Sequence, residues 1–137
     1  MILIDTGPIV ALFDKGDNYH KACLELLRTL KGPLITTMPV LTEAFYLLGF
    51  SWQVQEALWE FIGQEGLRIY NLNNDLFMRC RDLMKQYRDL PMDLADATLV
   101  AVAEAENSNT VFTLDQKDFK IYRTKHKKQF KLVPPKL

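Results

Sequence analysis

Short apolar runs alternate along the chain with longer segments in which apolar residues recur every three or four positions. The short runs are rich in Ile, Leu and Val and have the length of buried strands. They cover residues 1–4, 34–37, 67–72, 110–113 and, near the end of the chain, 132–133. The longer segments have the spacing of helices with one buried face, and they cover residues 17–30, 39–48, 51–63, 74–87 and 93–106. Strands separated by helices predict an α/β fold with a mostly parallel sheet.

Residues that begin or end helices stand at the boundaries of these segments. Pro8, soon after the first predicted strand, suits the first turn of a helix. Gly32 and Pro33 break the chain before the second predicted strand, and Ser51 can cap the helix that follows it. No internal repeat, low-complexity tract or linker divides the sequence. We therefore expect a single domain over residues 1–137.

The composition is that of a compact domain, since 48% of the 137 residues are apolar and 25% are charged. No apolar run reaches about 18 residues, the length that a membrane span needs. The first residues carry no basic segment ahead of the apolar run, so we expect no secretory signal, no membrane association and a cytoplasmic location. Cys23 and Cys80 lack the spacing of a metal-binding or redox pair, which argues against a disulfide framework or a zinc site.

Charge is distributed unevenly along the chain, although the formal net charge is zero. From Lys117 onward there are eight Lys or Arg residues and one acid, a net charge of +7, so the first 116 residues carry −7. A basic segment of this kind can bind a polyanion beside a site filled by cations, and a solvated tail explains it equally well. The interleaved aromatic residues Tyr122 and Phe130 could stack on unpaired bases. The candidate phosphate-binding residues are Lys120, Arg123, Lys125, Lys127 and Lys128.

Acidic residues stand where the predicted strands end. Asp5 directly follows the first strand, and Asp115 comes two residues after the fourth. Glu43 lies early in the helix after the second strand, and Asp93 and Asp96 open the helix that leads into the fourth. In open parallel sheets, ligand sites form beyond the carboxyl ends of the strands. Carboxylates gathered there repel one another unless a cation neutralises them, so Mg²⁺ or Mn²⁺, which prefer oxygen ligands, is the expected occupant.

Each acid also has a structural explanation. Asp5 can cap a helix at the end of the strand, and Asp115 can cap a short turn that follows it. Asp93 and the acid three residues later resemble a capping box, so we expect Asp93 to serve mainly as a helix cap. Glu43 can mark the exposed side of an apolar helix, and Asp118 is expected at the surface. The combination of acids, rather than any one of them, favours a metal site.

Four acidic motifs resemble those of PIN-domain ribonucleases, in order and over nearly the whole chain. They are ILIDT at residues 2–6, PVLTE at 39–43, LADA at 94–97 and TLD at 113–115. Within that family the chain is most similar to the VapC-type toxins of bacterial toxin–antitoxin pairs. The resemblance implies a parallel sheet of about five strands in the order 3-2-1-4-5, flanked by helices. It also implies an endoribonuclease that hydrolyses RNA phosphodiester bonds, a homodimer and a cognate antitoxin protein.

The resemblance also implies roles for individual residues. It gives the catalytic and metal-binding roles to Asp5, Glu43, Asp96 and Asp115, with Mg²⁺ or Mn²⁺ as cofactor. We expect Asp5 and Asp96 to be the main ligands, and the carboxylates to fix the cation and orient water rather than act as covalent nucleophiles. Thr6 and Thr113 match hydroxyl residues often found beside the quartet, and Asp93 is placed with them in a supporting role.

Other classes fit the residues less well. A phosphatase of the haloacid dehalogenase type needs a second aspartate two residues after the first, where this chain has Gly7. A receiver domain needs paired acids at its first strand, and a metal-free ribonuclease that uses two histidines finds no support around His20 or His126. The alternative that remains is a catalytically inactive PIN-like module that binds RNA or protein.

Overall fold

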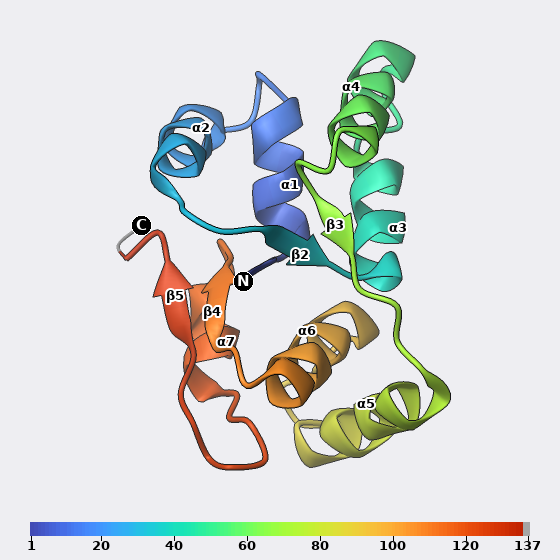
Figure 1. Ribbon diagram of the computed structural model, residues 1–137, viewed down its shortest axis with the longest axis vertical. Coiled ribbons are helices and arrows are strands. Elements are labelled where there is room, and N and C mark those ends of the chain that lie inside the picture. Colours follow the sequence, from blue (N-terminus) through green and yellow to red (C-terminus); the bar gives the residue numbers. More distant parts are fainter. Residues whose placement is uncertain (136–137) are drawn as a thin grey trace.

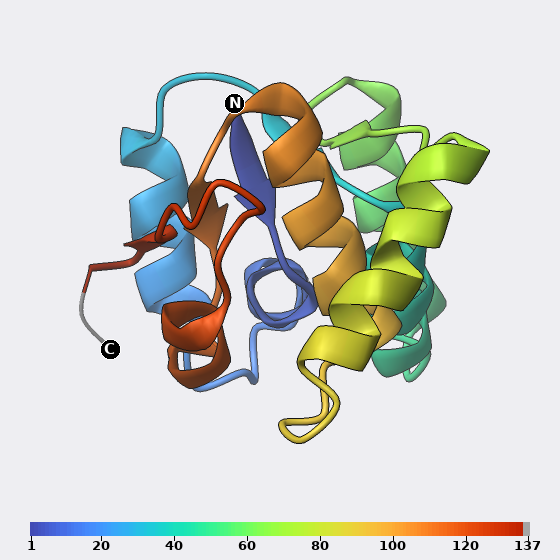
Figure 2. The same cartoon turned by 90° about the horizontal axis from the view of Figure 1, so that it is seen from below.

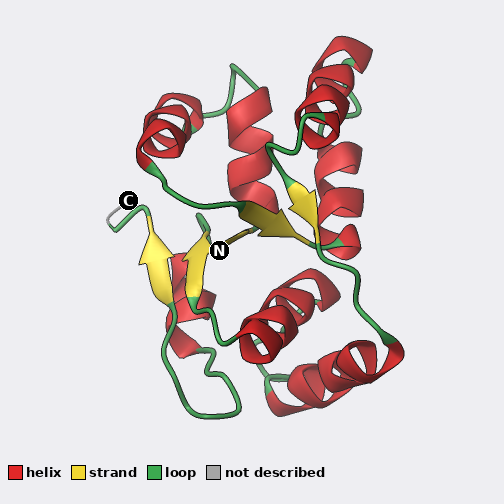
Figure 3. Cartoon of the chain, viewed as in Figure 1, coloured by secondary structure: helices red, strands yellow, loops and turns green. Residues whose placement is uncertain are grey.

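The chain folds into an open parallel sheet with helices on both sides (Figures 1 and 3). The computed structural model describes residues 1–135. Within them the strands are β1 (Ile2–Ile4), β2 (Leu34–Thr36), β3 (Arg68–Ile69), β4 (Thr110–Phe112) and β5 (Lys131–Val133). They lie in the order β3-β2-β1-β4-β5, and every neighbouring pair is parallel. The predicted α/β class and the strand order implied by the resemblance are both confirmed.

Helices cover the two faces of this sheet. In the described part of the chain they are α1 (Thr6–Phe13), α2 (His20–Thr29), α3 (Met38–Leu47), α4 (Trp52–Gly63), α5 (Asn74–Gln86), α6 (Leu94–Glu106) and α7 (Gln116–Ile121). α1, α2 and α4 lie on one side, and α5 and α6 lie on the other (Figure 1). Figure 2 shows α5 and α6 packed side by side, while α3 contacts both α1 and α6. Within residues 1–135, no helix is both long enough and apolar enough to cross a membrane.

The centre of the core is formed by β1 and α6. All three residues of β1 are buried, as expected for a central strand that is covered on both faces. α6 is buried from Ala95 to Ala103, because it packs against β1, α3 and α5. The small Ala side chains in this segment let the neighbouring elements approach closely. A helix with apolar residues on most of its sides needs an enclosed position of this kind.

The edge strand β3 is shorter than the sequence predicts. The apolar run at residues 67–72 indicates a longer strand, but only Arg68 and Ile69 belong to the sheet. These two residues lie opposite Ile35 and Thr36 of β2. β2 ends at that point because the chain turns into α3, so the rest of the run has no strand to pair with.

The connections of the sheet change direction beside β1. From β1 the chain passes through α1 and α2 to β2 on one side, and after β3 it crosses to β4 on the other side of β1. Asp5 directly follows β1, and Thr113 directly follows β4. Because Leu3 of β1 lies opposite Val111 of β4, the two strands end at the same edge. Ligand sites of open parallel sheets form at such a switch point, which makes this edge the first place to look for one.

Candidate metal centre

A cavity of about 420 Å³ lies at this switch point. Its walls come from the end of β1, from α3, from the start of α6 and from the connection between β4 and α7. The residues that line it are Asp5, Thr6, Gly7, Glu43, Asp93, Asp96, Leu114 and Asp115. All four acids of the predicted quartet are among them, and no residue in this lining is basic. The fold therefore brings the four acids to one cavity, and their roles there stay predictions.

Asp5 is held from two sides. Its Oδ1 accepts a 2.8 Å hydrogen bond from the backbone N–H of Thr6, where α1 begins. Its Oδ2 accepts a 3.0 Å bond from the hydroxyl of Thr113. The same hydroxyl oxygen accepts a 2.9 Å bond from the backbone N–H of Asp115. One fully buried threonine thus connects two of the predicted acids, and Asp5 is a helix cap as well as a wall of the cavity.

Asp96 lies in the first turn of α6 and is held by an aromatic residue of the basic segment. The expectation that Tyr122 and Phe130 stack on bases is wrong, because both side chains are buried. The hydroxyl of Tyr122, a fully buried side chain, donates a 2.9 Å hydrogen bond to Asp96 Oδ2. Asp93 Oδ1 accepts a 2.8 Å bond from the backbone N–H of Asp96, so the predicted capping role of Asp93 is confirmed. The capping box is only half formed, because the Asp96 carboxylate faces Tyr122 and the cavity.

Burial makes the ionised forms of these acids unfavourable. It raises the pKa of Asp5 to about 6, although the hydrogen bonds from Thr6 and Thr113 oppose the shift. Burial also raises the pKa of Asp96 to about 8, and the negative charges of Asp5 and Asp93 add to it. The pKa of Asp115 is raised as well, first by burial. A bound cation would reverse these effects, because an opposite charge favours the ionised carboxylate.

The tightest group of acids includes one that the sequence placed elsewhere. Asp96, Asp115 and Asp118 offer carboxylate oxygens that all lie within 4.8 Å of one another. Asp118, which we expected at the surface, is half-exposed in the first turn of α7 and lies beside the other two acids. Asp115 precedes α7, but its side chain makes no capping hydrogen bond among the described residues. Asp115 lines the acidic cavity, whereas Asp118 belongs to the group of acids without being part of the cavity lining.

Thr6 adds a hydroxyl group to the acidic cavity. Its hydroxyl oxygen is buried and finds no hydrogen-bond partner in the described part of the chain. A buried hydroxyl is normally paired, and Thr6 lines the acidic cavity. Oxygen atoms from carboxylates and hydroxyls are the ligands that Mg²⁺ and Mn²⁺ prefer, directly or through their water molecules. The residues present therefore fit a hard divalent cation.

Glu43 and Asp93 form the open side of the cavity. Both side chains are exposed, in contrast to Asp5 and Asp96. Both also line an adjoining hollow of about 640 Å³ between α3 and the start of α6. Residues in this exposed position are suited to contact a ligand that enters from solvent. The buried acids are better placed to hold an ion at the base of the cavity.

The five basic candidates do not form one patch. Arg123, Lys125 and Lys127 line a separate cavity of about 560 Å³ beside α5. Lys120 is exposed on α7. The Nζ of Lys128 donates a 3.0 Å hydrogen bond to a side-chain oxygen at the end of α6. Any binding of phosphate groups by this segment would therefore divide between different parts of the surface.

Comparisons with known proteins agree with this architecture. A family model described as PIN domain matches residues 2–125. Ribonuclease VapC26 of Mycobacterium tuberculosis (strain ATCC 25618 / H37Rv) is 24% identical over 135 residues, which are 97% of this chain and 100% of that protein.

Two solved structures share the fold. One is Mycobacterium tuberculosis VapC20, described as a toxin that cleaves the sarcin–ricin loop, with a TM-score of 0.77 and 21% identity over 86% of this chain and 94% of its own. The other is a toxin–antitoxin complex from Klebsiella pneumoniae, with a TM-score of 0.67 and 21% identity over 87% of this chain and 90% of that one. The family match spans most of the chain, and the fold and strand order agree with it, so the chain belongs to the PIN domain family.

Proposed function

We propose that the protein is a metal-dependent endoribonuclease that hydrolyses RNA phosphodiester bonds, and that it is the toxin of a toxin–antitoxin pair. The observation that carries the proposal is the cavity in which Asp5, Glu43, Asp96 and Asp115 meet at the switch point of a PIN-family sheet. The similarity to a protein named ribonuclease VapC26 supports RNA as the substrate class.

The acids at the strand ends have the positions to hold an ion. Asp96 and Asp115 would be ligands, with Asp118 close enough to complete the group. Asp5 would act from the β1 side, where Thr113 and the start of α1 fix its two oxygens. When bound, Mg²⁺ or Mn²⁺ supplies a nucleophile by lowering the pKa of water, and it neutralises charge that develops on the phosphate.

The remaining residues position these groups. Tyr122 holds one Asp96 oxygen by its hydrogen bond, which leaves the other oxygen for the cavity. Thr113 sets the distance between Asp5 and the backbone of Asp115. Glu43, on the exposed side, is placed to orient an attacking water molecule that arrives with the substrate. Such supporting contacts commonly change activity or metal affinity by about 10–100-fold when they are removed.

The proposal includes partners. Similarity to a toxin–antitoxin complex supports a cognate antitoxin protein, and membership of the family supports a homodimer. A location in the cytoplasm belongs to the same proposal, since a bacterial RNA substrate is found there.

The test is an assay of the purified protein on a panel of structured and single-stranded RNAs. With Mn²⁺ or Mg²⁺ we expect cleavage of at least one RNA, and excess EDTA should abolish it because the acids then lack the cation. A matched reaction with EDTA and restored Mn²⁺ controls for damage to the protein. Equal cleavage in EDTA would contradict the metal mechanism, and binding of RNA without cleavage in any metal would favour the inactive binding module.

A further inference from the structure

A second cavity, of about 560 Å³, has the opposite charge to the acidic one. It lies between the C-terminal part of α5 and the segment after α7. Arg79 on α5 and Tyr87 just after it line one side, and Arg123, Lys125 and Lys127 line the other. Four of these five side chains are cationic, and no residue of its lining is acidic. The charge pattern of the sequence points to part of this segment but to nothing on α5.

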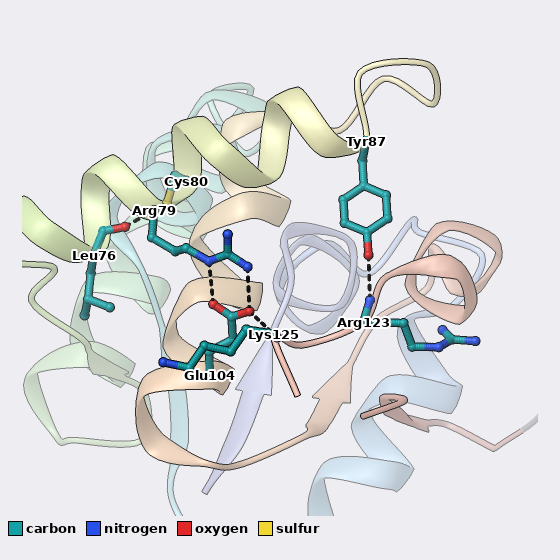
Figure 4. Close-up of polar contacts among 7 residues, drawn as sticks. All are labelled: Leu76, Arg79, Cys80, Tyr87, Glu104, Arg123 and Lys125. Carbon is teal, nitrogen blue, oxygen red and sulfur yellow. Dashed lines mark hydrogen bonds and ion pairs between the residues drawn. The ribbon is translucent and has the colours of Figure 1, made fainter. Parts of the chain in front are cut away.

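One nearly buried acid organises the cavity from behind. The Glu104 side chain on α6 is 4% exposed and forms a paired contact with Arg79, with Nε to Oε1 at 2.9 Å and Nη2 to Oε2 at 3.0 Å. The backbone N–H of Lys125 also donates to Glu104 Oε2. Figure 4 shows Glu104 between these two residues, with the third guanidinium nitrogen of Arg79 turned away from the carboxylate. Glu104 therefore holds both the Arg79 side chain of α5 and the backbone of Lys125 in place. Its charge is paired with Arg79 alone among the four cations.

The basic cavity is close to the acidic one. Asp96 and Glu104 are eight residues apart on α6, a distance of about 12 Å along the helix axis. Packed tyrosines connect the two places: the Tyr122 hydroxyl holds Asp96, and the rings of Tyr87 and Tyr122 have centroids 5.1 Å apart. The Tyr87 hydroxyl in turn accepts a 2.9 Å hydrogen bond from the backbone N–H of Arg123 (Figure 4).

We propose that this basic cavity is a binding subsite for a backbone phosphate of the RNA, a short distance along the strand from the phosphate at the acidic cavity. The inference rests on the proposed function for the identity of the polyanion. A strand with a phosphate at every nucleotide can occupy both cavities at once, whereas a single small anion can occupy one. Lys and Arg contacts to phosphates supply most of the affinity of proteins for nucleic acids. Tyr87, which is half-buried, adds an aromatic ring to the lining of the same cavity.

The three cations of the segment do not have equal roles. The Arg123 guanidinium donates from Nη1 to the carbonyl oxygens of Lys120, Ile121 and Tyr122, so it holds the end of α7 in place. In Figure 4 it points away from Arg79. Lys125 and Lys127 are exposed, and they are the residues whose charge can be removed without disturbing this framework.

The experiment measures binding of a fluorescent single-stranded RNA of mixed sequence by anisotropy at several NaCl concentrations, in EDTA so that the probe stays intact. The test variant is Lys125→Gln with Lys127→Gln. The matched control is Lys15→Gln with Lys31→Gln, which removes the same charge from exposed lysines outside both cavities. The slope of log affinity against log salt should fall by about 0.7 in the test variant, since the subsite holds one phosphate and each single-strand phosphate contact contributes about 0.7. The control should keep the slope of the unchanged protein.

Slopes that are equal in the test and control variants would overturn the subsite. Displacement of the labelled RNA by a poly-glutamate peptide as effectively as by unlabelled RNA would also overturn it, and would assign the cavity to an acidic protein partner. Thermal melting of both variants shows whether each one is folded. The cleavage assay in Mn²⁺ reports on the proposed function separately. A lower slope in the test variant, in a protein that cleaves no RNA, would support the subsite and refute the nuclease. Metal-dependent cleavage with an unchanged slope would support the nuclease and refute the subsite.

Discussion

Replacing Asp96 by Asn is expected to reduce metal-dependent RNA cleavage by about 100-fold or more while the protein stays folded. Asp96 belongs to the tightest group of carboxylates and lies in the acidic cavity, so its loss removes a charge that would hold the cation. Loss of a supporting contact to a metal site already changes activity by about 10–100-fold, and loss of a ligand should do at least as much. An Asn at this position can still accept the hydrogen bond from Tyr122, which preserves the packing.

Asp93→Asn is the matched control, since it makes the same change three residues earlier. Asn caps a helix about as well as Asp, so this variant should keep its fold and most of its activity. Initial rates of RNA cleavage in Mn²⁺ and melting temperatures provide the comparison. Full activity in Asp96→Asn would remove Asp96 from the site. A collapse of its melting temperature would instead make Asp96 a structural residue.

The second large effect concerns the pH dependence of stability without metal. The pKa values of Asp5 and Asp96, about 6 and about 8 in the folded protein, lie above the ordinary value of 3.8. At a pH between 3.8 and the raised pKa of each acid, the folded chain binds a proton that the unfolded chain has released. The free energy of unfolding therefore falls as the pH rises. The stabilisation is complete below about pH 4 and is lost as the pH passes 6 and then 8. Each unit of pKa shift corresponds to about 1.4 kcal/mol, so the loss amounts to several kcal/mol.

Melting temperatures in EDTA at pH 5, 6.5 and 8 would measure this loss, with Asp96→Asn as the comparison. The wild-type protein should melt at progressively lower temperatures, and the variant should show a much smaller decline because it lacks the group with the higher pKa. At pH 8, Mn²⁺ at 100 times its dissociation constant should stabilise the folded wild type by about 2.7 kcal/mol. Its melting temperature should therefore rise. If the melting temperature instead rose from pH 5 to 8 in EDTA, and by the same amount in both proteins, the pKa values of these acids would not be raised in the folded protein.

Much of the site could be predicted because each acid has a fixed place relative to a strand end. The apolar run before Asp5 ends abruptly at a charge, and Asp115 follows another such run by two residues. In a parallel sheet the ends of neighbouring strands meet, so these local patterns determine where the side chains come together. The N-cap at Asp93 was predictable for the same reason, since the pairing atoms are only three residues apart.

The contacts that support the acids could not be predicted from spacing. Tyr122 reaches Asp96 across 26 residues, and Arg79 reaches Glu104 across 25, so each pairing depends on how the chain returns after the sheet has formed. Asp118 lies on α7, a helix of six residues, which is too short to give a helical pattern in the sequence. Its position beside Asp96 follows from the path of the connection after β4, which no local signal reveals.

The position of a bound Mn²⁺ ion would test the central claim most directly. Crystals of the protein grown or soaked with MnCl₂ should give an anomalous difference peak in the acidic cavity, within coordination distance of Asp96 and Asp115. The peak should be absent from matched Asp96→Asn crystals. An Mn²⁺ peak elsewhere on the protein, with none in this cavity, in a preparation that cleaves RNA only when Mn²⁺ is present would contradict the account.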